Sequence, residues 1–190
     1  MTTDSESVAA SASVLSLTTD PRAVSGAVDA GALRAETGGI DLLGVLFAPG
    51  ATDWAHDVAT FGERVGRLGV VTGHDDISAA LSALPDDLRD MTQTFFAESP
   101  RSLGEIGVRV SDRLAEGGDV RNSRLVFVDG FERVLADTPL QTAFRFLHIL
   151  TEATAYTDTA LHVSLDPADC DDRTVETVAE LFESVVDDRP

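Results

Sequence analysis

One aspartate stands where a buried strand ends. Four apolar residues, 125–128 (LVFV), run directly into Asp129, and a glycine follows it. A carboxylate at the carboxyl end of a strand is placed to hold the water shell of Mg²⁺ beside a bound phosphate. The same carboxylate is equally placed to cap a helix expected from residue 131 to about 136. The sequence leaves both roles open.

An earlier segment has the outline of a phosphate-binding loop. The apolar stretch 40–47 is followed closely by Pro49 and Gly50, which match the turn of the pattern P-G-x-G-K-[ST]. Thr52, Asp53 and Trp54 stand in place of the second glycine, the lysine and the hydroxyl. A carboxylate about 4 Å from a phosphate repels it by several kcal/mol at an effective dielectric of about 20. An indole would fill the space that the phosphate needs, so the segment argues against ordinary ATP hydrolysis.

Other polar groups at strand ends are weaker candidates. Asp75 and Asp76 follow the apolar stretch 67–72 and, with Asp129, could hold magnesium or a nucleotide. A helix cap is the alternative role for either of them. The chain has no lysine, so only an arginine such as Arg101 or Arg133 could replace the missing charge, and no spacing places either one there. No structural zinc spacing and no nucleophile motif is present, so we expect no metal site and no catalytic residue.

The charge balance excludes some classes of partner. Asp and Glu number 33 against 14 basic residues, all of them arginine, and the formal net charge is -19. This composition is typical of proteins from cells with molar internal salt, where screening weakens self-repulsion. The acidity argues against direct binding to nucleic acid. The single Cys170, the absence of a secretory signal and the absence of a long apolar span indicate a cytoplasmic protein that does not enter a membrane.

Strands and helices alternate along the chain. We expect strands at 40–47, 67–72, 124–130 and 160–167, with a short edge strand at 12–19. Helices are expected over 53–67, 76–84, 102–116, 139–156 and 172–186, and the segment 86–100 fits either a helix or a loop. Ser102 and Glu105 have the spacing of a capping box. This pattern predicts an α/β fold, a mainly parallel sheet with helices on both faces, as a single domain over 13–188 after a disordered tail at 1–12.

Several stretches carry a resemblance to a known group. SPRSLGEIGVRVSDRL begins at residue 99, SRLVFVDGFERVLADTPLQTAFRFLHILT at 123, and LHVSLDPADCDDRTVETVAELFESVV at 161. Together they resemble a group of haloarchaeal proteins of unknown function related to the RecA/KaiC-like ATPases. The resemblance extends over roughly residues 38–188. It implies a three-layer RecA-like fold, with Asp129 as the acid at a strand end and Asp75 and Asp76 at positions that are acidic in KaiC-like ATPases.

The missing lysine then implies a degenerate ATPase. We expect a catalytically inactive domain that acts in regulation or signalling through protein contacts. The partner would be another protein, a RecA-like homologue or a second copy, and Phe95, Phe96 and Trp54 are candidate contact residues where exposed. The alternative is a nucleotide-binding switch without efficient hydrolysis, in which Asp129 and the loop 48–53 hold Mg-ATP. No other cofactor is expected.

Overall fold

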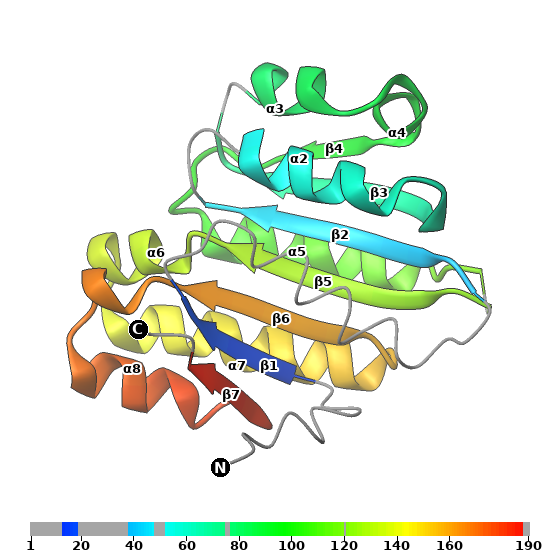
Figure 1. Cartoon of the computed structure of the whole chain (residues 1–190). Helices are drawn as coiled ribbons and strands as arrows, with labels where there is room; N and C mark the ends of the chain where they lie inside the picture. Colours follow the sequence, from blue (N-terminus) through cyan, green and yellow to red (C-terminus); the bar gives the residue numbers. More distant parts are fainter. Residues whose placement is uncertain (1–12, 19–37, 48–51, 75–76, 120, 188–190) are drawn as a thin grey trace, which may run out of the picture.

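Seven parallel strands form one sheet in the computed structural model, which describes residues 13–18, 38–47, 52–74, 77–119 and 121–187. The strand order is β4-β3-β2-β5-β6-β1-β7, and every pairing is parallel. Figure 1 shows the twisted sheet with helices packed against it. The expected α/β class is therefore confirmed. The proposed tail at 1–12 lies outside the described residues.

The strands are β1 (Ser13–Leu17), β2 (Ile40–Leu46), β3 (Val65–Thr72), β4 (Gln93–Phe96), β5 (Ser123–Asp129), β6 (Ala160–Leu165) and β7 (Ser184–Asp187). The α-helices are α2 (Thr52–Phe61), α3 (Ser78–Ala83), α4 (Asp86–Met91), α5 (Leu103–Ala115), α6 (Phe131–Asp137), α7 (Leu140–Tyr156) and α8 (Asp172–Ala179). Two 3-10 turns, at Gly62–Arg64 and Pro167–Asp169, complete the described elements.

Two apolar cores lie on opposite faces of the sheet. Side chains of α5, α6, α7 and α8 pack with alternate strand residues such as Val45, Val126 and Val163 to form the larger core. Side chains of α2, α3 and α4 pack with the intervening residues, including Leu42 and Phe127, to form the smaller one. In Figure 1, α2 lies in front of the sheet, and α5 and α7 lie behind it. This arrangement accounts for the uniformly apolar strands, because both faces of the central strands are covered.

A change of side between neighbouring strands marks one point of the sheet. The helix that follows β2 packs in the smaller core, whereas the helix that follows the adjacent strand β5 packs in the larger one. Such a topological switch opens a crevice outside the carboxyl ends of the two strands, where ligands bind in open parallel sheets. A ligand is therefore expected to bind in the crevice outside the carboxyl ends of β2 and β5.

Three expectations about the elements are wrong. β1 is not an edge strand, because it lies between β6 and β7. The final helix ends at Ala179, and the chain then forms β7, in which Val185 is exposed rather than turned inward. The capping box does not form either: Ser102 makes no side-chain cap bond, and Glu105 instead accepts from the Glu98 amide at 2.9 Å. The ambiguous segment 86–100 contains both α4 and β4.

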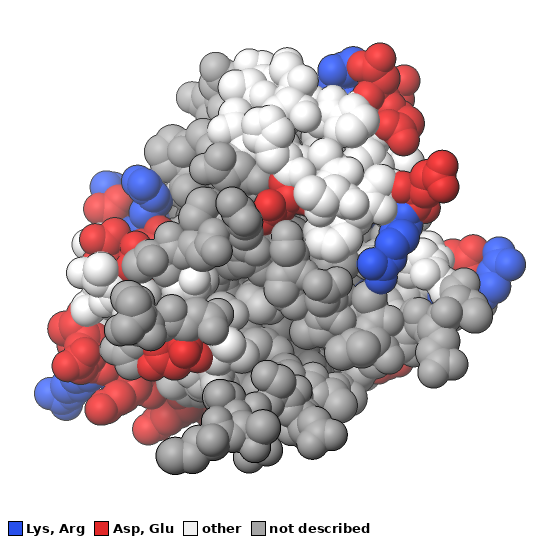
Figure 2. Space-filling view, viewed as in Figure 1, with Lys and Arg blue, Asp and Glu red and all other residues white. Residues whose placement is uncertain are grey.

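The described surface is acidic, with arginines beside the acids. Figure 2 shows red carboxylate side chains gathered toward both sides of the visible face, and the blue side chains stand next to them. Ion pairs such as Arg101 with Asp137 and Arg121 with Asp119 account for part of this pattern. No described helix is long and apolar enough to cross a lipid bilayer.

Candidate functional site

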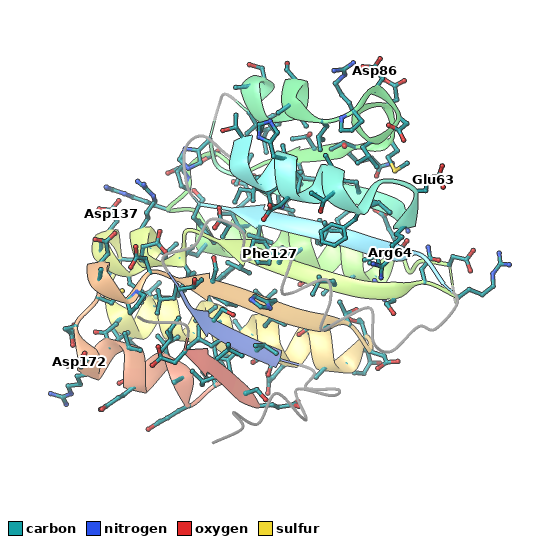
Figure 3. The ribbon with its side chains drawn as sticks, viewed as in Figure 1. Glu63, Arg64, Asp86, Phe127, Asp137 and Asp172 are labelled. Carbon is teal, nitrogen blue, oxygen red and sulfur yellow. The ribbon has the colours of Figure 1, made fainter. Side chains whose placement is uncertain are left out.

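A cavity of about 310 Å³ lies at the topological switch. Four segments that follow β2, β3, β4 and β5 line it, with Phe47, His74, Ser99, Pro100, Arg101, Arg133, Val134, Asp137 and Thr138. Figure 3 shows Asp137 at this carboxyl edge, across the molecule from Glu63 and Arg64 near the amino edge. The elements thus bring together residues as far apart in the sequence as Phe47 and Thr138.

Two guanidinium groups reach the cavity. The Arg101 Nη2 atom lies 3.0 Å from Asp137 Oδ2, so that pair joins the loop before α5 to the end of α6. Arg133 lies one helical turn before Asp137 on α6, is exposed, and is held by no ion pair with a described residue. No spacing in the sequence joins Arg101 to Arg133, and the fold places both at one cavity.

His74 has a fixed orientation at the cavity wall. Its ring Nε2 lies 2.8 Å from the Phe47 carbonyl oxygen, and a carbonyl only accepts, so Nε2 donates. The backbone amide of His74 donates to Thr72 Oγ1 at 3.1 Å, and that hydroxyl donates to the Leu46 carbonyl. The histidine therefore ties the end of β3 to the end of β2.

Asp129 does not cap the helix that follows it. The N-cap position of α6 is Gly130, which adopts the left-handed conformation with φ of 76°, and no side chain caps this helix. Asp129 Oδ1 instead accepts from Ser164 Oγ at 3.2 Å, across to the neighbouring strand β6. Of its two expected roles, the structure excludes the cap. Asp75 and Asp76, the other members of the expected magnesium or nucleotide group, lie outside the described residues.

The loop with the phosphate-loop outline is described only in part. Pro49 and Gly50 lie outside the described residues, as does the side chain of Asp53. Thr52 is half-buried at the start of α2. Trp54 is only 2% exposed and its indole packs against Gly44 of β2, where an added Cβ would lie 2.9 Å from the ring. Trp54 is therefore a core residue of the smaller cluster and not a surface contact.

The other two candidate contact residues differ from each other. Phe95 is partly buried against the larger core, and the Arg113 guanidinium lies 4.9 Å from its ring centroid. Phe96, the next residue of the edge strand β4, is 49% exposed. Only Phe96 of the three therefore presents a largely open aromatic surface.

The remaining titratable groups fit structural roles. Burial lowers the pKa of His162 to about 4, and its Nε2 atom has no hydrogen-bond partner. Burial, followed by the charges of Glu132 and nearby aspartates, raises the pKa of the Cys170 thiol to about 11. A thiol with that pKa is a poor nucleophile at neutral pH. Within the described ranges, no group of three His, Cys, Asp or Glu side chains is arranged to hold a metal ion.

A second polar cluster lies at the opposite, amino edge of the sheet. Asn122 Nδ2 donates to Asp41 Oδ1 at 2.8 Å, and Asn122 Oδ1 accepts from the Gly39 amide at 3.0 Å. Arg124 donates to the carbonyls of Leu114 and Thr157 at 2.8 and 3.3 Å. These bonds tie the loops that enter β2, β5 and β6. Sequence reasoning missed this cluster, and its position at the amino ends of the strands indicates a structural role.

A groove on the outer surface of α5 and α7 is the largest apolar hollow among those described. It encloses about 520 Å³ and is lined by apolar and small residues, chiefly Gly104, Gly107, Val108, Phe146, Ile149 and Ala153. Val108 is 58% exposed and Ile149 is 51% exposed. The spacing of Ile106, Val110 and Leu114 leaves Val108 on the other side of α5, whereas Ile149 belongs to the broad apolar face of α7 and no sequence signal marked it as exposed.

Comparison with known proteins identifies a family. Residues 11–188 match the model of a family of unknown function, DUF7504. No curated protein matches the chain. Because the family model covers nearly the whole sequence, the chain belongs to this family.

Proposed function

We propose that this member of DUF7504 is a RecA/KaiC-like domain that does not hydrolyse ATP and that acts in regulation through protein contacts. The resemblance of its C-terminal half to that superfamily supports the RecA-like part, and the replacement of the expected lysine by Asp53 supports the loss of hydrolysis. The observation that carries the protein-contact role is the exposed apolar groove between α5 and α7.

The proposed occupant of this groove is a second copy of the chain. Asp112 of α5 and Arg145 of α7 both line the groove and are both exposed, yet neither forms a side-chain ion pair with another described residue. In a two-fold arrangement, each copy presents the same patch to the other, so a residue pair is used twice. Arg145 of one copy would face Asp112 of the other, and these opposite charges would attract each other.

The shape of the groove suits the same arrangement. Val108 and Ile149 project into solvent, whereas Gly104 has no atom within 4 Å of an added Cβ and Gly107 has only the Phe146 ring, at 3.8 Å. The glycines leave space on α5 that an apolar side chain of the second copy can fill. Burial of the exposed apolar side chains would contribute roughly 25 cal/mol per Å² to association.

The test is a charge exchange followed by solution mass. Arg145→Asp and Asp112→Arg should each shift the protein toward monomer by about fivefold or more in dissociation constant. The double variant should recover much of the lost affinity between copies, because the ion pair forms again with its two charges exchanged. Val185→Glu, at an exposed apolar residue on β7, is the matched control and should not change the mass. Single variants that assemble like the parent protein would refute the proposed contact.

A second candidate function has one observation in its favour. Asp129 ends β5, where a magnesium-bound nucleotide would need a carboxylate, and its Oδ1 atom accepts from Ser164 Oγ. In this version the chain is a nucleotide-binding switch without efficient hydrolysis, with the loop 48–53 supplying main-chain donors. Calorimetric titration of Mg-ATP should then show binding that Asp129→Ala weakens by at least tenfold, without turnover. Equal affinity in the variant would exclude this candidate.

A further inference from the structure

We propose that the cavity at the ends of β2, β3, β4 and β5 binds a small organic phosphate monoester. The phosphoryl group would lie between the guanidinium groups of Arg101 and Arg133. The organic part would lie against the apolar wall. This site differs from the groove between α5 and α7, and its use does not depend on that contact.

The charge at the cavity is the first argument. The whole chain carries a formal charge of -19, yet two of its 14 basic residues line this one hollow, where Asp137 supplies the one carboxylate among the described residues. Asp137 is already paired with Arg101. Arg133 has no ion-pair partner among the described residues, so its planar donor fork is available to an added anion. Arginine forks match the geometry of phosphate oxygens.

The neutral polar groups supply further donors. The hydroxyls of Ser99 and Thr138 line the same cavity. Ser99 Oγ accepts from the Arg101 amide at 3.1 Å, which leaves the hydroxyl hydrogen to donate elsewhere. The Nε2–H group of His74 donates to the Phe47 carbonyl, so Nδ1 of the neutral imidazole is left as an acceptor for a ligand hydroxyl. A phosphoryl group with several oxygens can accept from both hydroxyls and from both guanidinium groups, whereas a single halide cannot.

The size and the apolar wall argue for an organic body. Phe47 and Val134 are buried side chains of the larger core, and with Pro100 they form the non-polar lining. A volume of about 310 Å³ lies at the lower end of the range of small-molecule sites and far exceeds that of inorganic phosphate alone. The crevice position at the switch between β2 and β5 is where parallel α/β sheets bind such molecules.

The test follows the histidine ring protons by NMR while AMP or inorganic phosphate is added in about 2 M KCl without magnesium. The chain has four histidines, so the spectrum is simple. We expect a saturable shift of the His74 signal and none for His148, which lies exposed on α7 with its Nε2 atom 3.7 Å from Glu152 Oε1. AMP should bind at least about tenfold more tightly than inorganic phosphate, because only AMP reaches the apolar wall.

Two arginine variants distinguish a specific AMP site from nonspecific attraction of the anion to any exposed arginine. Arg133→Gln should weaken AMP binding by about tenfold or more, since one charge-assisted contact is lost. Arg64→Gln, at an exposed arginine near the amino edge that forms no ion pair with a described residue, is the control and should leave the affinity unchanged. Both residues are exposed, so unfolding midpoints should match those of the parent protein. Two results would overturn the proposal. One is the absence of a His74 shift at about 20 mM ligand, the weakest dissociation constant of interest. The other is an equal loss of AMP affinity in both variants.

Discussion

At the scale of single residues, Trp54 shows that a residue in a strand-end motif can pack in the core instead of contacting a ligand. The sequence placed this indole where a phosphate loop needs a hydroxyl. The fold turns it inward onto Gly44, with 2% of it exposed. The indole nitrogen has no hydrogen-bond partner in the described structure, which agrees with a role in filling space.

The contact between Gly44 and Trp54 gives a stability prediction. Gly44→Ala places a methyl group 2.9 Å from the indole and should lower the free energy of unfolding by about 1–3 kcal/mol. Trp54→Phe should also destabilise, but the double variant should lose less than the sum of the two, because the smaller ring relieves the overlap. Chemical denaturation in molar KCl measures all three. Strict additivity would mean that the two side chains do not compete for the same space.

His162 predicts a pH dependence of stability. Burial lowers its pKa from the ordinary 6.5 to about 4 in the folded chain. Between these values the unfolded chain binds a proton that the folded chain does not, so stability falls as the pH drops from 6.5 to 4. The loss approaches about 3 kcal/mol at the lower limit.

The control for this prediction removes the titrating group. His162→Phe keeps an aromatic ring beside Phe127, whose centroid lies 5.5 Å from that of the imidazole. Unfolding free energies measured at pH 7 and pH 4.5 should fall more steeply for the parent protein than for the variant. Parallel losses in the two proteins would show that His162 titrates normally.

At the scale of elements, long periodic or strongly apolar segments were predictable and short ones were not. The strands at 40–46 and 123–129 and the helix α7 follow directly from apolar runs and from the helical spacing of apolar residues. The helix prediction for the last segment was wrong at its end. The spacing of Val178, Phe182 and Val185 is typical of a helix, but the helix ends at Ala179 and Val185 belongs to β7. β7 forms because it pairs with the neighbouring strand β1, and no local residue pattern predicts that pairing.

The two helix caps provide a matched comparison. Asp171 accepts from the Thr174 amide at 3.0 Å and from its hydroxyl at 2.7 Å, so Asp171→Ala should lower the unfolding free energy by about 1 kcal/mol. Ser102 makes no cap bond, so Ser102→Ala should cost less than about 0.5 kcal/mol. Thermal unfolding of both variants under one salt condition checks the order. A larger loss at Ser102 would contradict the assigned hydrogen bonds and restore the capping box.

The candidate cavity shows the same limit of prediction. Arg101 and Arg133 were both visible as replacement cations, but their meeting depends on how the segments after β4 and β5 converge at the carboxyl edge. That convergence is set by strand order, which brings β2 between β3 and β5. The spacing of Arg133 and Asp137 on α6 was the one local signal, and it gives only their shared helix face.

At the scale of the whole molecule, acidity and assembly are linked. A net charge of -19 repels a second copy unless salt screens it, and the Debye length is only about 3 Å at 1 M salt. Under such screening, contacts between copies depend on apolar burial and on charges in direct contact. The groove between α5 and α7 offers both, through Val108 and Ile149 and through Asp112 and Arg145.

The most direct test of the protein-contact role is the mass of the protein in solution, measured by light scattering in about 2 M KCl (well above the salt at which exposed charges are screened). Two chains of 20.1 kDa give about 40 kDa, and we expect that mass for the parent protein and for Val185→Glu. Ile149→Glu should give about 20 kDa, because a carboxylate would replace an apolar side chain that lines the groove. A parent protein of about 20 kDa at every concentration, or an Ile149→Glu variant that remains at about 40 kDa, would contradict the account.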